Sequence, residues 1–242
     1  MSKLKLSSRE IGSVRVFDLE GDANQQEDLQ EVAWKIQKNI RRYRLQRIIL
    51  NLQKIPTLDL LGVRKLLAAC LRPQQSLIYG ASSNVKLLFE NSYMPRNVHV
   101  CDSEVQVAED LGPFLLEKEK EKEFPVITAP GDQLPPGIQL ERRRSKRMHV
   151  ALPLHLKITL ASGEIVESRA IATNISEGGL FAKYLDLDAS RRIEDMESIN
   201  GFAAEIEIHP SNNFPEEYKL KGIVRRKELE KKQLGVAVEF IS

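Results

Sequence analysis

The chain has 242 residues, and its 36 basic and 34 acidic side chains leave a net charge of only +2, which excludes a protein that is basic over its whole surface. Apolar residues make up 42% and charged residues 29%, as in a water-soluble globular protein long enough for two ordinary domains. No apolar run approaches the ~20 residues of a membrane span, and residues 1–12 hold no apolar signal core. We therefore expect a cytoplasmic protein without a membrane span.

Catalytic and metal-binding patterns are missing from the sequence. The two cysteines, Cys70 and Cys101, do not make a disulfide framework, and Cys70 falls on the apolar face of a helix pattern. The four histidines lack the spacing of metal ligands. There is no nucleophile–base pair at a recognisable spacing and no phosphate-binding Gly-Lys-Ser loop. We expect a protein that is not an enzyme and needs neither a metal nor a cofactor.

Strand and helix patterns alternate through the first half of the chain. The apolar spacing predicts strands in residues 14–19, 48–52, 77–79 and 98–100, and helices in residues 29–40, 63–71, 85–89 and 105–115. Residues 48–52 are almost continuously apolar, as in a strand that is buried on both faces of a parallel sheet. This alternation predicts an α/β layer.

The centre of this half carries a family resemblance. An apolar strand, the sequence IPTLDLLG at residues 55–62, and a following helix together resemble the STAS family of anti-sigma-factor antagonists. The sequence YGASS at residues 79–83 and the segment 98–103 fit the same pattern. The resemblance spans roughly residues 8–116, and it implies a STAS-like α/β domain in residues 1–116.

The chain departs from this family at one position. Regulatory STAS domains carry a phosphorylatable serine after the aspartate, whereas Leu60 follows Asp59 here. Leucine cannot carry a phosphate, so the charge switch is absent at this position. We interpret Asp59 as the N-cap of the next helix, and Thr57 and Ser82 as turn residues. We expect mass spectrometry to find no phosphate in residues 56–63, and we expect the domain to bind an unidentified protein partner.

A linker is expected between the halves. Residues 117–123 alternate Glu and Lys without a break and are expected to extend the last helix. Pro and Gly pairs then interrupt regular structure up to residue 137. We place the linker at residues 117–140.

The second half reads as a series of strands. Leucine or isoleucine occupies every second position in residues 152–160, and a turn at residues 162–163 follows. Further strands are expected at residues 165–175, 180–184, 202–208, 220–225 and 234–241. We interpret residues 186–201 as a loop or one helical turn, and residues 227–233 as a connection. Short antiparallel strands joined by turns predict a closed barrel.

Two short stretches in this half have the chemistry of an anion site. The sequence RRRSKR at residues 142–147 holds four arginines and a lysine, and NISEGG at residues 174–179 places two polar side chains before a glycine pair. Arginine binds phosphate, or the O6/N7 edge of guanine, through two parallel hydrogen bonds. Taken alone, the first stretch is more simply a solvated linker and the second an ordinary turn.

Together, the two stretches resemble the PilZ family, whose small β-barrels bind the bacterial second messenger cyclic di-GMP. The resemblance rests on an Arg-x-x-x-Arg motif before the barrel and an Asn-x-Ser-x-x-Gly motif at the end of its second strand. It covers about the last hundred residues and implies a PilZ domain in residues 141–242. The residues that match the two motifs, with the arginine that commonly precedes the first, are Arg142, Arg143, Arg147, Asn174, Ser176 and Gly179.

The resemblance implies how the ligand would be bound. The arginines would contact its phosphates and guanines, with Arg144 as a further phosphate contact, and Asn174 and Ser176 would hydrogen-bond a guanine. Gly179 would let the backbone approach the ligand closely. Ordering of the linker would then move the first domain relative to the barrel. These expectations describe a second-messenger receptor that signals through its STAS-like domain, and they leave a homodimer open.

Two other functions compete with the receptor. One is an interaction scaffold whose barrel binds no ligand, although both motifs are complete. The other is nucleic-acid binding through the run of arginines at residues 142–147, which the near-neutral net charge and the absence of aromatic residues beside the run disfavour. We therefore expect no nucleic-acid partner.

Overall fold

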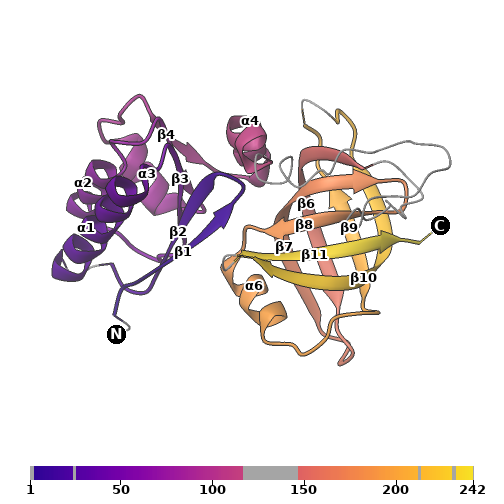
Figure 1. Ribbon diagram of the computed structural model, residues 1–242. Helices are drawn as coiled ribbons and strands as arrows, with labels where there is room; N and C mark the ends of the chain where they lie inside the picture. Colours follow the sequence, from indigo (N-terminus) through magenta and orange to yellow (C-terminus); the bar gives the residue numbers. More distant parts are fainter. Residues whose placement is uncertain (1–2, 24–25, 117–146, 212–213, 231–232, 242) are drawn as a thin grey trace, which may run out of the picture.

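The computed structural model describes residues 3–23, 26–116, 147–211, 214–230 and 233–241. They form a five-stranded sheet covered by helices and a closed six-stranded barrel (Figure 1). The predicted fold class, an α/β domain followed by an all-β barrel, is confirmed. The predicted linker and its Glu/Lys run lie outside the described residues, so the domain boundaries remain a prediction.

The sheet of the N-terminal domain has the order β1-β2-β3-β4-β5, in which β2 to β5 are parallel and β1 is antiparallel to β2. The strands are β1 (Lys5–Ile11), β2 (Val14–Glu20), β3 (Arg47–Lys54), β4 (Gln75–Tyr79) and β5 (Val98–Cys101). Strand β1 is not predicted by the apolar pattern, because only Leu6 and Ile11 are apolar in it. Hydrogen bonds with β2 stabilise this strand, although few of its side chains are apolar.

Helices cover the two faces of this sheet unequally. One face carries α1 (Gln26–Tyr43), α2 (Leu60–Ala69) and α3 (Ser83–Glu90), while α4 (Glu104–Leu115) lies between the sheet and the barrel (Figure 1). Asp59 caps α2 as predicted, since its Oδ1 accepts a hydrogen bond from the Gly62 amide at 2.6 Å. No helix within the described part of the chain is long and apolar enough to cross a membrane.

Strand β3 is buried on both faces, as its apolar run predicted. Ile48, Leu50 and Leu52 join the core beneath α1 to α3. Ile49 points to the opposite face and joins a separate core with Leu77 and α4. Both faces of the sheet are therefore covered in this region, although only one helix lies on the second face.

The barrel has the strand order β10-β11-β8-β7-β6-β9 and closes through the pairing of β9 with β10. Its strands are β6 (Met148–Thr159), β7 (Ile165–Ser176), β8 (Gly179–Tyr184), β9 (Ala203–Ile208), β10 (Tyr218–Glu230) and β11 (Gln233–Phe240). Helix α6 (Leu187–Glu194) follows β8. The strictly alternating side chains of β6 supply Leu152, Leu154, Leu156 and Ile158 to the interior, where all four are buried.

Two expectations for this half were wrong in extent. Strand β10 does not stop at residue 225 but continues, paired with β11, to Glu230, so most of the predicted connection is strand. Its end is rich in charge because it lies on an exposed ribbon. The segment after β8 forms the eight-residue helix α6 rather than a loop or a single turn, because Ala189 and Ile193 bury one face of it.

A shared apolar core joins the two domains. Ile171 of β7 and Leu185 lie in one buried cluster with Val16, Ile49 and Leu77 of the sheet. Helix α4 packs against β6 so closely that a Cβ at Gly112 would lie 3.2 Å from the Ala151 side chain. The barrel thus covers the part of the second sheet face that α4 leaves open.

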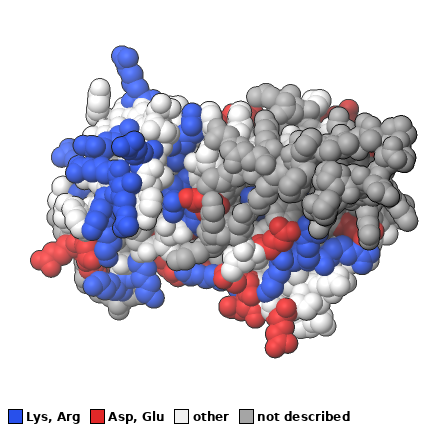
Figure 2. Space-filling view, viewed as in Figure 1, with Lys and Arg blue, Asp and Glu red and all other residues white. Residues whose placement is uncertain are grey.

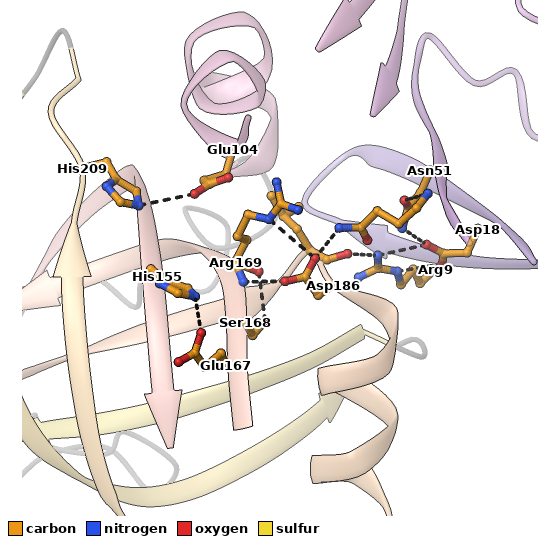
Figure 3. Close-up of polar contacts among 12 residues, drawn as sticks. Arg9, Asp18, Asn51, Glu104, His155, Glu167, Ser168, Arg169, Asp186 and His209 are labelled. Atoms are coloured by element: carbon orange, nitrogen blue, oxygen red, sulfur yellow. Dashed lines mark hydrogen bonds and ion pairs between the residues drawn. The ribbon is translucent and has the colours of Figure 1, made fainter. Parts of the chain in front are cut away.

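A buried polar cluster at the same interface links β1 to the chain around residues 184–186 (Figure 3). Arg9 makes a two-pronged ion pair with Asp18, with N–O distances of 2.8 and 3.0 Å. The same guanidinium donates to the backbone oxygens of Tyr184 and Leu185, both at 2.7 Å. The side chains of Arg9 and Asp18 are 4% and 2% exposed, so a buried guanidinium is bound to a carboxylate of its own domain and to two carbonyls of the other.

Further polar contacts surround this cluster. Asp186 accepts a hydrogen bond from the Arg169 amide at 2.6 Å and another from the Gln53 side chain at the end of β3 (Figure 3). Other pairs between the domains are Lys54–Asp188, Arg191–Glu20 and His209–Glu104. The two domains are therefore in direct contact through apolar and charged groups.

Candidate ligand-binding site

The second predicted motif lies on the hairpin between β7 and β8. Ser176 pairs with Gly179 across a two-residue turn, and the Ser176 hydroxyl donates to the Gly179 carbonyl at 3.3 Å. Asn174 and Ser176 are both half-buried. They stand two residues apart on one strand, so their side chains project from the same face. The hairpin thus presents an amide and a hydroxyl side by side at one end of the barrel.

Arg147 lies at the same end of the barrel. The ladder between β6 and β7 pairs Met148 with Ile175 and His149 with Asn174. One residue further in this register, Arg147 comes to the level of Ser176, and its side chain is half-buried. The structure therefore brings together the last residue of the first motif and the two polar residues of the second.

The rest of the first motif cannot be placed in the same way. Arg142 and Arg143, with Arg144, lie outside the described residues, so their contribution stays a prediction. They precede Arg147 by only three to five positions.

His149 is a neighbour of the site that the sequence motifs do not contain. It pairs with Asn174 across the ladder, and residues directly opposite each other in an antiparallel pair project their side chains from one face. The histidine is half-buried and can donate or accept a hydrogen bond, or stack on a base. Its proximity follows from strand register, which the motif spacing does not contain.

Gly179 has a structural role that no ligand is needed to explain. A Cβ at this position would lie 2.2 Å from the Val238 carbonyl oxygen of β11 and 3.1 Å from the Cα of Glu239. Any larger residue would therefore push β8 and β11 apart at the pair Gly179–Glu239. The glycine allows the barrel to close beside the motif.

Two irregularities separate the site from the regular part of the barrel. Val150 and Ala151 of β6 together oppose the single residue Thr173 of β7. Thr173 is itself the extra residue of β7 where the register against β8 shifts. Such bulges re-aim side chains and bend the strand. Ala151 also contacts α4, so the bulge stands between the site and the domain interface.

The described residues contain neither a metal cluster nor a reactive thiol. None of their His, Cys, Asp and Glu side chains forms a group of three or more that could hold a metal ion. Cys70 and Cys101 are both buried, and burial raises the pKa of each thiol to about 12. Neither is therefore a thiolate nucleophile at neutral pH.

Comparison with known proteins gives similarities of structure only. No protein-family model matches the sequence, and no curated protein matches it. Among solved structures, the chain is similar to the PilZ domain with c-di-GMP of YcgR from Escherichia coli, with 18% identity over 42% of this chain and 79% of that chain, at a TM-score of 0.30. It is likewise similar to the Bacillus subtilis inhibitor of motility MotI/DgrA, with 18% identity over 43% of this chain and 44% of that chain, at a TM-score of 0.32.

A third similarity is to the Bacillus cell fate determinant SpoIIAA in its phosphorylated form, with 17% identity over 44% of this chain and 98% of that chain, at a TM-score of 0.31. The chain thus spans less than half of the motility inhibitor but nearly all of SpoIIAA. The closed barrel and the helix-covered sheet are the two folds that the sequence resemblances to PilZ and STAS domains implied. At these identities and TM-scores, the similarities assign neither a family nor a ligand to this chain.

Proposed function

We propose that this protein is a receptor for cyclic di-GMP that binds the dinucleotide at the end of the barrel and passes the signal to a protein partner through its N-terminal domain. The observation that carries the proposal is the position of Arg147 at the level of Ser176, beside Asn174. Two motifs that are 27 residues apart in the sequence meet there with donors for phosphate and for a guanine edge.

Each residue has a role that its chemistry supports. Arg147 and Arg143 contact phosphate oxygens or the O6/N7 edge of guanine, and their planar guanidinium groups stack on the bases. Arg142 adds a phosphate contact. Asn174 and Ser176 hydrogen-bond a guanine from the barrel side. His149, opposite Asn174, extends this polar face.

The signal would act on a contact that already exists between the domains. Strand β7 carries Asn174 near one end and Ile171, part of the shared apolar core, three residues earlier. Strand β6 carries Ala151 against α4 only four residues after Arg147. A ligand that favours one arrangement of the intervening bulge would change how α4 and the barrel pack. The signal would then be a change in the packing between the two domains. It would not require the first domain to move freely on the linker.

The N-terminal domain offers a surface to a protein partner at the start of α2. Leu60 and Leu61 are 44% and 43% exposed there, next to the capping Asp59. Exposed leucines beside a helix start suit docking of an apolar segment. If the barrel binds no ligand, this surface makes an interaction scaffold the second candidate.

Calorimetric titration of the purified full chain with cyclic di-GMP tests the proposal. We expect saturable heat that GTP does not reproduce and that the double variant Arg143→Ala/Arg147→Ala loses. Arg147→Ala alone should weaken binding by at least ~2 kcal/mol, about 30-fold, because it removes a charge-assisted contact that is partly buried. The control is Arg225→Ala, which removes an exposed arginine from β10 and should leave the affinity unchanged. An absence of heat, or equal affinities of Arg147→Ala and Arg225→Ala, would contradict the proposal.

A further inference from the structure

The amino ends of the parallel strands form a strongly basic edge of the N-terminal domain. We call it the amino-edge surface. Residues 35–47, from the second half of α1 to the start of β3, hold six basic residues and no acidic one. Lys and Arg side chains gather over this domain, at the left of Figure 2. The arginines that the strand starts and helix ends bring to this edge include Arg15, Arg42, Arg44, Arg47, Arg72 and Arg96.

Helix dipoles account for only part of this charge. In a parallel sheet with one helix after each strand, all four helices α1 to α4 end at this edge. Their carboxyl ends carry roughly −0.5 charge each, and α1 alone among them has basic residues in its last turn, Arg41 and Arg42. Arg47 and Arg72, however, lie at a strand start and in a loop, outside any last turn. Glu10 is paired with Arg15, so the positive charge of the edge comes from its other arginines.

The arginines are arranged with aromatic rings. The guanidinium carbons of Arg15 and Arg42 lie 5.3 and 5.4 Å from the centre of the Tyr43 ring, and Tyr43 is 51% exposed. Arg47 lies 3.2 Å from the centre of the Phe114 ring at the end of α4. Phe114 and Arg47 are half-buried, so the exposed ring is Tyr43, with Arg15 and Arg42 beside it. Such a group is a platform on which unstacked bases add while neighbouring arginines contact phosphate.

Arg44 has a left-handed backbone conformation, in which glycine is the usual residue. Its φ is +49°, the left-handed region in which helix ends usually place glycine. The hydrogen bond from the Leu45 amide to the Ile40 carbonyl, at 3.1 Å, belongs to the same helix-ending turn. An arginine at this position opposes the local preference of the backbone, which points to a use for its side chain.

We propose that the amino-edge surface binds a single-stranded polynucleotide. Phosphates would be contacted by the arginines, and a base would stack on Tyr43 and its guanidinium partners. The surface lies in the N-terminal domain and shares no residue with the proposed dinucleotide site in the barrel. The near-neutral net charge of the chain therefore does not argue against this partner, because the charge is concentrated on one edge.

Fluorescence anisotropy tests this inference. Labelled oligo(dT) and oligo(U) of about 15 nucleotides are titrated with the full chain at several salt concentrations. We expect binding that weakens with salt. The variant Arg42→Gln/Arg44→Gly should lower the slope of log K against log salt by about 1.4, since each phosphate contact to a single strand contributes about 0.7. The glycine suits the left-handed backbone, so this variant should fold at least as well as the natural chain. Tyr43→Ala should weaken binding at least fivefold.

Two controls separate this surface from other causes. Lys219→Gln/Lys221→Gln removes two exposed charges from the barrel and should leave the slope unchanged. Arg143→Ala/Arg147→Ala should lose cyclic di-GMP but keep the oligonucleotide, so the two proposals fail independently. Comparison of DNA with RNA identifies which polymer is preferred. Binding to phosphatidylserine vesicles without binding to either oligonucleotide would overturn the proposal in favour of a membrane surface, and binding to neither would overturn it outright.

Discussion

Arg9, held by its buried ion pair with Asp18, should make the strongest polar link between the domains through the carbonyls of Tyr184 and Leu185. Replacing Arg9 by methionine removes the two-pronged guanidinium from the Asp18 carboxylate, which is 2% exposed. The carboxylate then keeps the hydrogen bond from the Asn51 amide at 2.8 Å. The replacement also leaves the carbonyls of Tyr184 and Leu185 without the guanidinium donor. Removing one partner of a buried pair costs ~3–5 kcal/mol, so we expect the free energy of unfolding to fall by about 4 kcal/mol.

Urea denaturation followed by two signals measures this loss and its effect on domain coupling. Fluorescence of Trp34, the single tryptophan, reports on the N-terminal domain, while circular dichroism reports on both domains. The two curves should coincide for the natural chain and separate for Arg9→Met. The matched control is Arg15→Met, which breaks an ion pair with Glu10 inside one hairpin and should cost less without separating the curves. A loss below ~1 kcal/mol for Arg9→Met, with coincident curves, would refute the reasoning.

Three further outcomes follow from the structure. Gly179→Ala should destabilise the barrel by at least ~2 kcal/mol in urea denaturation, because its Cβ would lie 2.2 Å from the Val238 carbonyl, and an unchanged midpoint would show that β8 and β11 are not so close. Burial raises the pKa of the Cys70 thiol to about 12, so iodoacetamide at pH 8 should label it only after unfolding; rapid labelling of the folded chain, seen by mass spectrometry, would contradict this. The hydrogen bond from Arg191 holds the pKa of Glu20 below its usual range, so this ion pair stabilises the fold above the ordinary glutamate pKa and loses its effect as the pH falls through the lowered value. Glu20→Gln should therefore cost at most ~1 kcal/mol at pH 7, since both side chains are partly exposed, and less at pH 3; an equal cost at both pH values would contradict this reasoning.

The sequence predicted elements whose own pattern decides their structure. Helix α1 and strands β3 and β6 carry a clear periodicity, and each was found within a few residues of its expected bounds. Strand β1 was missed because its stability comes from pairing with β2 rather than from its two apolar residues. The end of β10 was missed for the same reason, since a charged ribbon resembles a loop until its partner strand is known.

The candidate site was predicted in part, and the domain interface was not. Asn174, Ser176 and Arg147 were identified by their motifs, but His149 required the register between two strands. Arg9 looks like an exposed charge in a polar segment, and only tertiary structure shows that it is buried. One indirect signal of the interface existed. Strands with apolar residues on both faces must be covered on both, and α4 alone cannot cover the second face of the sheet.

Hydrogen–deuterium exchange of the full chain with and without saturating cyclic di-GMP tests the central claim most directly, because it reports binding and its location together. We predict slower exchange in peptides covering residues 142–149 and 174–180, a smaller change in α4, and none at the amino ends of β3 and β4. Unchanged exchange in residues 142–149 and 174–180 at saturating ligand would contradict the claim that this end of the barrel is the receptor site.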